Sequence, residues 1–182
     1  MLDGLVERVL STYAYRFTQA CSADDRAVAF RMRGDAAGSG WDEDSYDDVA
    51  VLLLGRDGDG EPVSTGRLVL PPHPLPTQDA CGIVVEPAGR VVDVGRMCVA
   101  TTYRSYRQAA YVALLCGLYR EMREGGFATA CGMMSPPVRR LTRLIGLTLE
   151  ELGPDRQHLG EPRAPVRFAL TAVATGQSAT GE

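Results

Sequence analysis

The sequence predicts a single mixed α/β domain, an α+β fold with a mostly antiparallel sheet. Its 182 residues suit one domain with a full core. Apolar residues make up 45% of the chain and charged residues 23%, which is typical of a globular protein rather than a disordered one. Helical and strand patterns also alternate along the chain. We expect residues 1–175 to form the domain and residues 176–182 to be a flexible tail.

Two helices are expected at the N-terminal end. Apolar residues from Leu2 to Tyr13 keep near-helical spacing, which predicts a helix over residues 2–20. Ser22 can cap a second helix that runs from Ala23 to about Arg33 and has two aspartates in its first turn. A glycine-rich loop over residues 34–40 should follow.

A hairpin and a long strand are expected in the middle of the chain. The hairpin comprises a buried strand at 49–55, a turn at 56–60 and a returning strand at 62–70. The proline-rich residues 71–76 must form a loop, because proline cannot donate to a ladder. A weaker strand is expected at 82–86 and a central strand at 89–100.

The second half of the chain alternates helices and strands. A mostly apolar helix is expected over residues 102–124, with Gly125 and Gly126 ending it. The remaining expected elements are a strand at 127–133, a short helix at 136–145, and strands at 147–152 and 166–173.

Composition excludes several kinds of function. The sequence contains no lysine, which excludes a Schiff-base lysine and a P-loop lysine. Its five cysteines form no CxxC pair, so we expect neither a metal site nor disulfides. No apolar run is long enough for a membrane span and no signal peptide is visible, so a cytoplasmic location is expected.

Charge is distributed unevenly. Residues 96–143 contain 8 Arg and 2 acidic residues, although the whole chain has a net charge of −4. A basic stretch in an acidic protein suits one phosphate-bearing ligand or an acidic protein partner better than nucleic acid.

Several short motifs follow one another in a fixed order. They are Arg26 with Phe30, Trp41, Asp44-Ser45-Tyr46-Asp47, Thr65-Gly66-Arg67-Leu68, Asp93-Val94-Gly95-Arg96, and the apolar helix after Tyr103-Arg104. This order, over roughly residues 20–150, resembles the acyl-homoserine-lactone (autoinducer) synthases and the N-acyl amino acid synthases, a branch of the GNAT acyltransferase superfamily. The sequence departs from those families in having Asp93 where a Glu is usual, and Met-Cys after Arg96.

The resemblance implies a GNAT-like fold in which helices flank a twisted sheet with a V-shaped gap between its middle strands. It also implies an acyl donor on phosphopantetheine (acyl-ACP or acyl-CoA), an amine acceptor, no permanently bound cofactor and no metal. A thioester is already activated, so such an enzyme mainly positions the amine and stabilises the oxyanion. An α-amine has a pKa near 8, so making it neutral at pH 7 costs only about 1.4 kcal/mol.

Asp93 and Arg96 are the expected catalytic residues, with Asp93 holding the acceptor ammonium and relaying its proton through water. Positions three apart on a regular strand point to opposite faces, and the resemblance implies a bulge that brings the pair to one face. The alternative interpretation is a structural ion pair between Asp93 and Arg96.

The resemblance places the acceptor site on the N-terminal part of the chain. The expected substrate-binding residues are Arg26, Phe30, Trp41, Asp44, Asp47 and Arg67. Other interpretations stay open: Arg67 paired structurally with Asp44 or Asp47, Trp41 as a core anchor, and residues 42–48 as a solvated loop or a cation site.

The donor is expected to bind at the end of the central strand and at the turn that follows. The expected donor-binding residues are Cys98, Val99, Thr101, Thr102, Arg104 and Arg107. Residues 101–107 contain no glycine, so their side chains hinder the close backbone approach by which helix N-termini bind a diphosphate. The single phosphate of a carrier-protein arm suits this turn better. Arg139, Arg140 and Arg143 are expected to dock an acidic acyl carrier protein.

The function predicted is therefore transfer of an acyl group from a carrier-protein thioester to the amine of a small molecule, such as an amino acid. Alternatives are a CoA-dependent GNAT acetyltransferase, an autoinducer synthase that uses S-adenosylmethionine, and a non-catalytic domain that binds a carrier protein. A Cys98 nucleophile activated by His73 or His158, and an RNA-binding surface, are less favoured, and His158 is expected at the surface.

Overall fold

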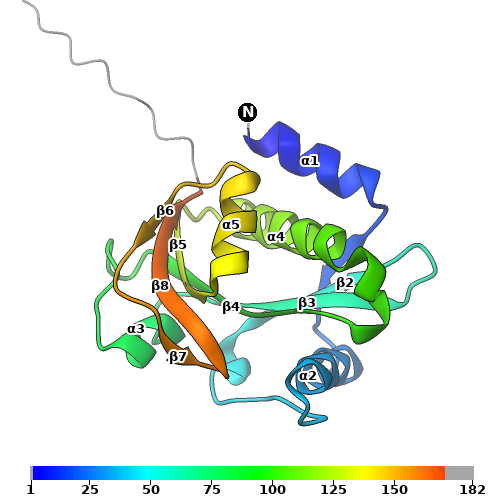
Figure 1. The fold of residues 1–182 in the computed structure, drawn as a ribbon, viewed down its shortest axis with the longest axis horizontal. Helices are drawn as coiled ribbons and strands as arrows, with labels where there is room; N and C mark the ends of the chain where they lie inside the picture. The colour runs from blue at the N-terminus through cyan, green and yellow to red at the C-terminus, as the bar shows by residue number, and fades with distance from the viewer. Residues whose placement is uncertain (1, 171–182) are drawn as a thin grey trace, which may run out of the picture.

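The computed structural model describes residues 2–170, without the side chains of residues 104–106. Its sheet has the strand order β1-β2-β3-β4-β5-β8-β6, and β7 pairs with β8 (Figure 1). Only β4 and β5 run parallel, and the other described pairs are antiparallel. The predicted mixed, mostly antiparallel sheet is therefore confirmed.

The strands are β1 (Arg16–Gln19), β2 (Val51–Arg56), β3 (Pro62–Val69), β4 (Val91–Val99), β5 (Thr129–Met134), β6 (Leu149–Glu151), β7 (Arg156–His158) and β8 (Glu161–Ala169). The α-helices are α1 (Leu2–Thr12), α2 (Ala23–Ala37), α3 (Pro76–Cys81), α4 (Arg107–Glu124) and α5 (Pro136–Leu144). Two 3₁₀ helices, η1 (Asp47–Val49) and η2 (Thr101–Tyr106), complete the elements.

Helices cover both faces of the sheet (Figure 1). The main core lies beneath α1 and α4, where Val6 and Leu114 pack with Val92 and Val94 of β4. On the opposite face, α2 packs on β2 through Phe30 and Leu52. A third apolar cluster beside α3 contains buried residues of β3, β4 and β5. Alternate residues of β4 therefore belong to different cores, as the pleat of a strand requires.

The N-terminal end departs from the prediction of one helix over residues 2–20. Helix α1 ends at Thr12, and Ala14 adopts a left-handed φ of 52°. The next residues form edge strand β1, in which Phe17 lies against Gly55 of β2 and Gly117 of α4. A helix over the same residues could not place Phe17 between these two glycines. Tertiary packing therefore overrides the apolar spacing.

Helix α2 begins as predicted and ends later. The Ser22 hydroxyl accepts a hydrogen bond from the Asp25 N–H, which confirms the predicted cap. The helix continues past Arg33 to Ala37, so it includes Gly34. A Cβ on Gly34 would lie 2.0 Å from the Trp41 backbone nitrogen. Glycine is required there because the chain crosses directly over the helix on its return.

Strand β4 contains the predicted bulge. Its register with β3 shifts between the pairs Thr65–Cys98 and Arg67–Gly95, and Arg96 has a positive φ of 50°. Strand β4 pairs with β5 only over Val91–Asp93, although both strands continue beyond that point. The middle strands therefore separate after Asp93, which agrees with the predicted V-shaped gap.

Several smaller elements differ from the prediction. Residues 82–86 form no strand, and Pro76 begins α3 instead of ending a loop. The helix predicted from residue 102 starts with the 3₁₀ helix η2. The last strand begins at Glu161 and not at 166, and its partner β7 was not predicted. The predicted strand end at 171–173 and the tail at 176–182 lie outside the described residues.

No helix within residues 2–170 is both long enough and apolar enough to cross a membrane.

Candidate active site

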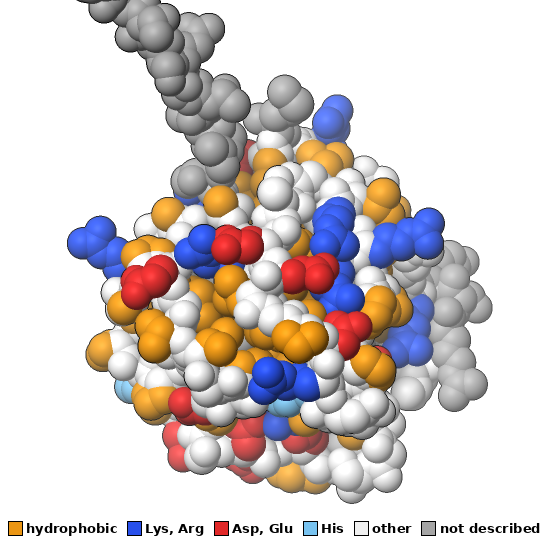
Figure 2. All heavy atoms as spheres, turned by 60° about the vertical axis from the view of Figure 1, so that its left-hand side comes forward, with side chains coloured by type: hydrophobic (Ala, Val, Ile, Leu, Met, Phe, Trp, Pro, Cys, Tyr) orange, Lys and Arg blue, Asp and Glu red, His pale blue; other side chains and the backbone are white. Residues whose placement is uncertain are grey.

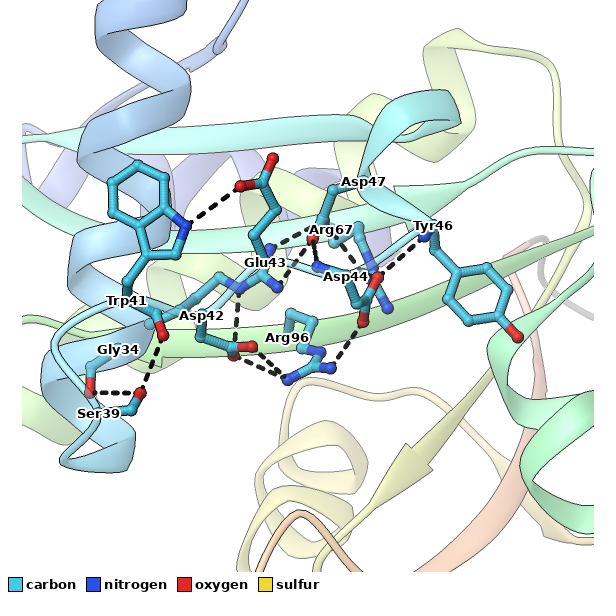
Figure 3. Close-up of polar contacts among 11 residues, drawn as sticks. Gly34, Ser39, Trp41, Asp42, Glu43, Asp44, Tyr46, Asp47, Arg67 and Arg96 are labelled. Atoms are coloured by element: carbon cyan, nitrogen blue, oxygen red, sulfur yellow. Dashed lines mark hydrogen bonds and ion pairs between the residues drawn. The ribbon is translucent and has the colours of Figure 1, made fainter.

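A closed network of three arginines and three aspartates lies on the face of the sheet that α2 and α3 cover (Figure 3). Its members are Arg33 of α2, Arg67 of β3, Arg96 of β4, and Asp42, Asp44 and Asp47 from the segment after α2. The six formal charges cancel, so the network is neutral as a unit.

The inner part of the network is buried. Arg33 makes a two-pronged contact with Asp47, with nitrogen–oxygen distances of 2.9 and 3.0 Å. Arg67 donates to Asp44 at 2.6 Å and to Asp47 at 3.1 Å. Asp47 is 0% exposed. The pairing of Arg67 with both aspartates agrees with the structural interpretation of that arginine.

The outer part reaches the surface. Arg96 donates to Asp42 at 2.7 Å and to Asp44 at 2.6 Å. Their side chains are 17%, 22% and 26% exposed, respectively. A small molecule arriving from solvent can therefore contact Arg96 and these two carboxylates, while Arg33 and Asp47 remain enclosed.

The arginines keep the buried carboxylates ionised. Burial by itself raises the pKa of Asp47, but hydrogen bonds from Arg33 and from the Asp44 N–H, together with both guanidinium charges, lower it below the ordinary value. The pKa of Asp44 is lowered in the same way, because Arg67 and Arg96 outweigh its burial. Both groups are therefore anions at neutral pH and weak proton acceptors.

Aromatic contacts fix α2 to the segment after it. The guanidinium carbons of Arg26 and Arg33 lie 5.6 and 5.4 Å from the Phe30 ring centroid. Trp41 meets Phe30 edge to face and is 47% exposed, with its indole N–H donating to Glu43. The core-anchor interpretation of Trp41 is therefore wrong. Arg26 also donates to the Asp47 backbone carbonyl at 2.6 Å.

Asp93 lies on the same face but outside the network. Its carboxylate accepts a hydrogen bond from the Thr77 N–H at 2.7 Å and lies 3.6 Å from the Cys131 sulfur. It is buried, and this burial raises its pKa although Thr77, Cys131 and Arg67 act in the opposite direction. The alternative of an Asp93–Arg96 ion pair is not what the structure contains, because Arg96 pairs with Asp42 and Asp44.

The predicted donor residues follow the bulge. Cys98 packs beneath α2, and burial raises the pKa of its thiol to about 12, which argues against a thiolate nucleophile. Val99 is buried against Ala110 of α4. Thr101 and Thr102 line a pocket of about 480 Å³ together with Asp35 and Glu61. Arg107 is exposed at the start of α4, and the side chain of Arg104 lies outside the described residues.

The three arginines of α5 do not form a continuous basic surface. Arg139 pairs with Asp155 at 2.6 Å, and Arg143 pairs with Glu151 at 3.0 Å. Arg140 is exposed. Figure 2 shows a face of the molecule on which acidic and basic side chains alternate around apolar ones.

No group of three or more His, Cys, Asp or Glu side chains is placed to hold a metal ion in the described part of the chain. The carboxylates of Asp42, Asp44 and Asp47 face guanidinium groups, so the cation-site interpretation of residues 42–48 lacks free ligands.

Two members of the network, Arg33 and Asp42, were not among the predicted site residues. A signal for Arg33 existed, because it lies seven residues after Arg26 and two helical turns place both on one face of α2. Both arginines indeed contact Asp47. Asp42 had no comparable signal, since its contact with Arg96 joins residues 54 positions apart.

Comparison with known proteins identifies the fold. Neither a family model nor a curated protein matches the sequence. Among solved structures, the acyl-homoserine-lactone synthase LasI is 13% identical, with a TM-score of 0.72 over 87% of this chain and 90% of that one. The CoA-dependent acyl-homoserine-lactone synthase BjaI, solved with SAM and isopentyl-CoA, is 17% identical, with a TM-score of 0.71 over 87% and 83%.

FeeM, an N-acyl amino acid synthase from uncultured soil microbes, is 15% identical, with a TM-score of 0.63 over 85% and 89%. The chain therefore has the GNAT-like fold of acyl-transferring enzymes, as the resemblance implied. It shares this fold with acyl-homoserine-lactone synthases and with an N-acyl amino acid synthase.

Replacing Asp47 with Asn is expected to lower the free energy of unfolding by about 3–5 kcal/mol, because the buried charge of Arg33 would keep only its longer contact with Asp42 at 3.5 Å. Urea unfolding at pH 7 measures the change. The exposed neighbour provides a matched control, and Asp48→Asn should change stability by less than about 0.5 kcal/mol. Equal stability of the two variants would contradict the assigned role of the buried pair.

Replacing Asp93 with Asn is expected to stabilise the protein increasingly as pH rises. A carboxyl group with a raised pKa in the folded state favours folding below its unfolded pKa of about 3.9 and loses that contribution as pH rises through the folded pKa. The difference in Tm between Asp93→Asn and the parent protein should therefore increase between pH 4 and pH 8. Asp59→Asn, in the β2–β3 turn, should show no such trend.

Proposed function

We propose that the protein is an N-acyltransferase that moves an acyl group from a phosphopantetheine thioester to the amine of a small molecule, such as an amino acid. Acyl carrier protein is the preferred donor in this proposal. The observation that carries it is the bulge at Arg96, which lies beside the separation of β4 from β5 and turns Arg96 toward a surface-reaching charged network.

The thioester arm would lie between the separated strands. Cys98 and Val99 lie on the part of β4 that has left β5. Beyond them, Thr101, Thr102, Arg104 and Arg107 would hold the phosphate of the arm through hydroxyl and guanidinium groups. The absence of glycine from residues 101–107 supports a single phosphate over the diphosphate of CoA. A CoA donor is the main competing hypothesis.

The acceptor would meet the outer part of the network. Arg96 can hold a carboxylate, and Asp42 and Asp44 can hold an ammonium, so the two charged groups of an amino acid both find partners. Trp41 and Phe30 would form an apolar wall beside them. Asp93 contributes its carboxylate in this proposal only if α3 moves away from β4, since Thr77 now covers it.

The decisive experiment compares the products formed from one acyl group on carrier protein and on CoA. Intact-mass analysis against a panel of amino acids and other amines identifies the donor, the acceptor and the product together. We expect an N-acyl amino acid from the carrier-protein donor. Carrier-protein binding without product would instead support a non-catalytic domain, and preferential use of acyl-CoA would overturn the donor assignment.

Replacing Arg96 with Ala is expected to lower kcat/KM by about 100-fold or more, because a guanidinium that positions the reacting groups is lost. Arg31→Ala removes an exposed arginine of α2 and serves as the control with unchanged activity. Circular dichroism checks that both variants fold. Full activity of a folded Arg96→Ala variant would reject the assigned role.

Reversing the charge of Arg140 is expected to weaken binding of acyl carrier protein by about tenfold, because the exposed guanidinium faces an acidic partner. The same Arg140→Glu variant should react normally with a small pantetheine thioester that has no protein attached. Equal loss with both donors would contradict docking on α5. Arg31→Glu controls for the change in net charge.

A further inference from the structure

The hairpin of β7 and β8 lies at the open end of the gap beside β4. Strand β5 pairs with β8 up to the pair Met134–Ala164 and ends there. The bulged half of β4 and the first residues of β8 both continue past that point, at the same end of the sheet. No strand of the described chain lies between them. His158 of β7 pairs with Glu161 in this extension of β8.

One side chain of helix α4, that of Tyr111, lies near both sides of this opening. The Tyr111 side chain packs against Val99 of β4 and the main core. Its hydroxyl is influenced by the Cys98 thiol of β4 and by Glu161 and Arg163 of β8, while burial raises its pKa. Strands β4 and β8 are therefore close enough at this point for titratable groups on both to affect the pKa of Tyr111.

An unused hydrogen-bond donor is present at the opening. Arg163 pairs with Glu161 through Nη2 at 2.7 Å, but its buried Nε–H has no acceptor within the described residues. Leaving a buried donor without an acceptor is unfavourable. A ligand carbonyl oxygen is the kind of group that would satisfy it.

His158 lies near enough to both sides of the opening for charges on each to act on it. It is partly buried, and its pKa is lowered first by burial and then by the positive charges of Arg163 on β8 and Arg96 on β4. Glu161, which pairs with His158 between β7 and β8, forms an ion pair with Arg163. The imidazole is therefore neutral at pH 7 and has one ring nitrogen available as a proton acceptor.

We propose that His158 is the proton acceptor for the attacking nitrogen at the open end of the gap, an inference that rests on the proposed N-acyltransferase function. The amine lone pair forms the C–N bond while the carbonyl π pair moves to oxygen. His158 takes the proton from the nitrogen, which bond formation has made acidic. The oxyanion then re-forms the carbonyl and expels the pantetheine sulfur, and the imidazolium returns the proton to that sulfur, giving an amide and a thiol.

The other groups of the site suit this step less well. Asp44 and Asp47 are weak bases because the arginines lower the pKa of each. Asp93 is enclosed beneath α3. A neutral imidazole has a pKa nearer to the working pH than the lowered pKa values of Asp44 and Asp47, which is the condition for efficient proton transfer.

The test measures kcat against pH for the parent protein, His158→Gln and His73→Gln, using the best donor–amine pair. We expect the parent kcat to rise with pH through a midpoint below about 6.5 and then level off. His158→Gln should lower kcat by about 100-fold, abolish this rise, and leave both KM values within twofold. His73→Gln removes the other histidine, from the loop before α3, and should match the parent.

A second variant separates chemistry from folding. Added imidazole should restore part of the activity of His158→Ala, which a purely structural defect would not allow. His158→Gln with parent kcat and pH profile, or His158→Ala without rescue, would overturn the role of His158 alone. A parent protein that forms no product from any donor–amine pair would overturn the proposed function and this inference together.

Discussion

The buried pair of Arg33 and Asp47 determines how the rest of the site is arranged. Both side chains are almost fully removed from water, and without the other each would keep only a longer contact, Arg33 with Asp42 at 3.5 Å and Asp47 with Arg67 at 3.1 Å. Their two-pronged contact fixes the segment after α2 against the sheet. Gly34 permits this close approach, because any side chain there would collide with Trp41. The positions of Asp42 and Asp44, and through them that of Arg96, follow from this contact.

The bulge in β4 and the network require each other. Strict alternation would place Arg96 on the face beneath α4, among the apolar residues of the main core. The extra residue turns the guanidinium to the face of α2 and α3, where Asp42 and Asp44 neutralise it. The positive φ of Arg96 costs conformational energy, and two charge-assisted hydrogen-bonded pairs offset that cost.

Local patterns in the sequence predicted the secondary-structure elements better than they predicted which charged residues of the site pair with each other. The cap at Ser22, the β2–β3 hairpin and the bulge depend on nearby residues or on motif order, and all three are present. Strands β1 and β7 have only four and three residues, too few to show a periodic pattern, so their pairing with β2 and with β8 decides their existence. The sequence predicts that Arg96 acts with Asp93, three residues away. It does not predict the contact with Asp42, because no local pattern marks a contact between residues 54 positions apart.

His158 illustrates a different limit. Its surroundings in the sequence are prolines, glycines and polar residues, which are typical of a surface loop. Only the pairing of β7 with β8, and the early end of β5, bring it near Arg96. A residue in a strand as short as β7 has no periodicity or motif in the sequence that would reveal its environment.

The neutrality of the network has a consequence for acceptor binding in the proposed reaction. No arginine of the network is unpaired, so an incoming carboxylate that takes the place of an existing contact at Nη1 or Nη2 of Arg96 replaces Asp42 or Asp44. Such an exchange substitutes one carboxylate for another and leaves no guanidinium without a partner. The displaced aspartate, already partly exposed, becomes available to the ammonium of the same acceptor. A neutral network can therefore select a zwitterionic acceptor, because a ligand with only one of the two charges would leave either Arg96 or the aspartate incompletely paired.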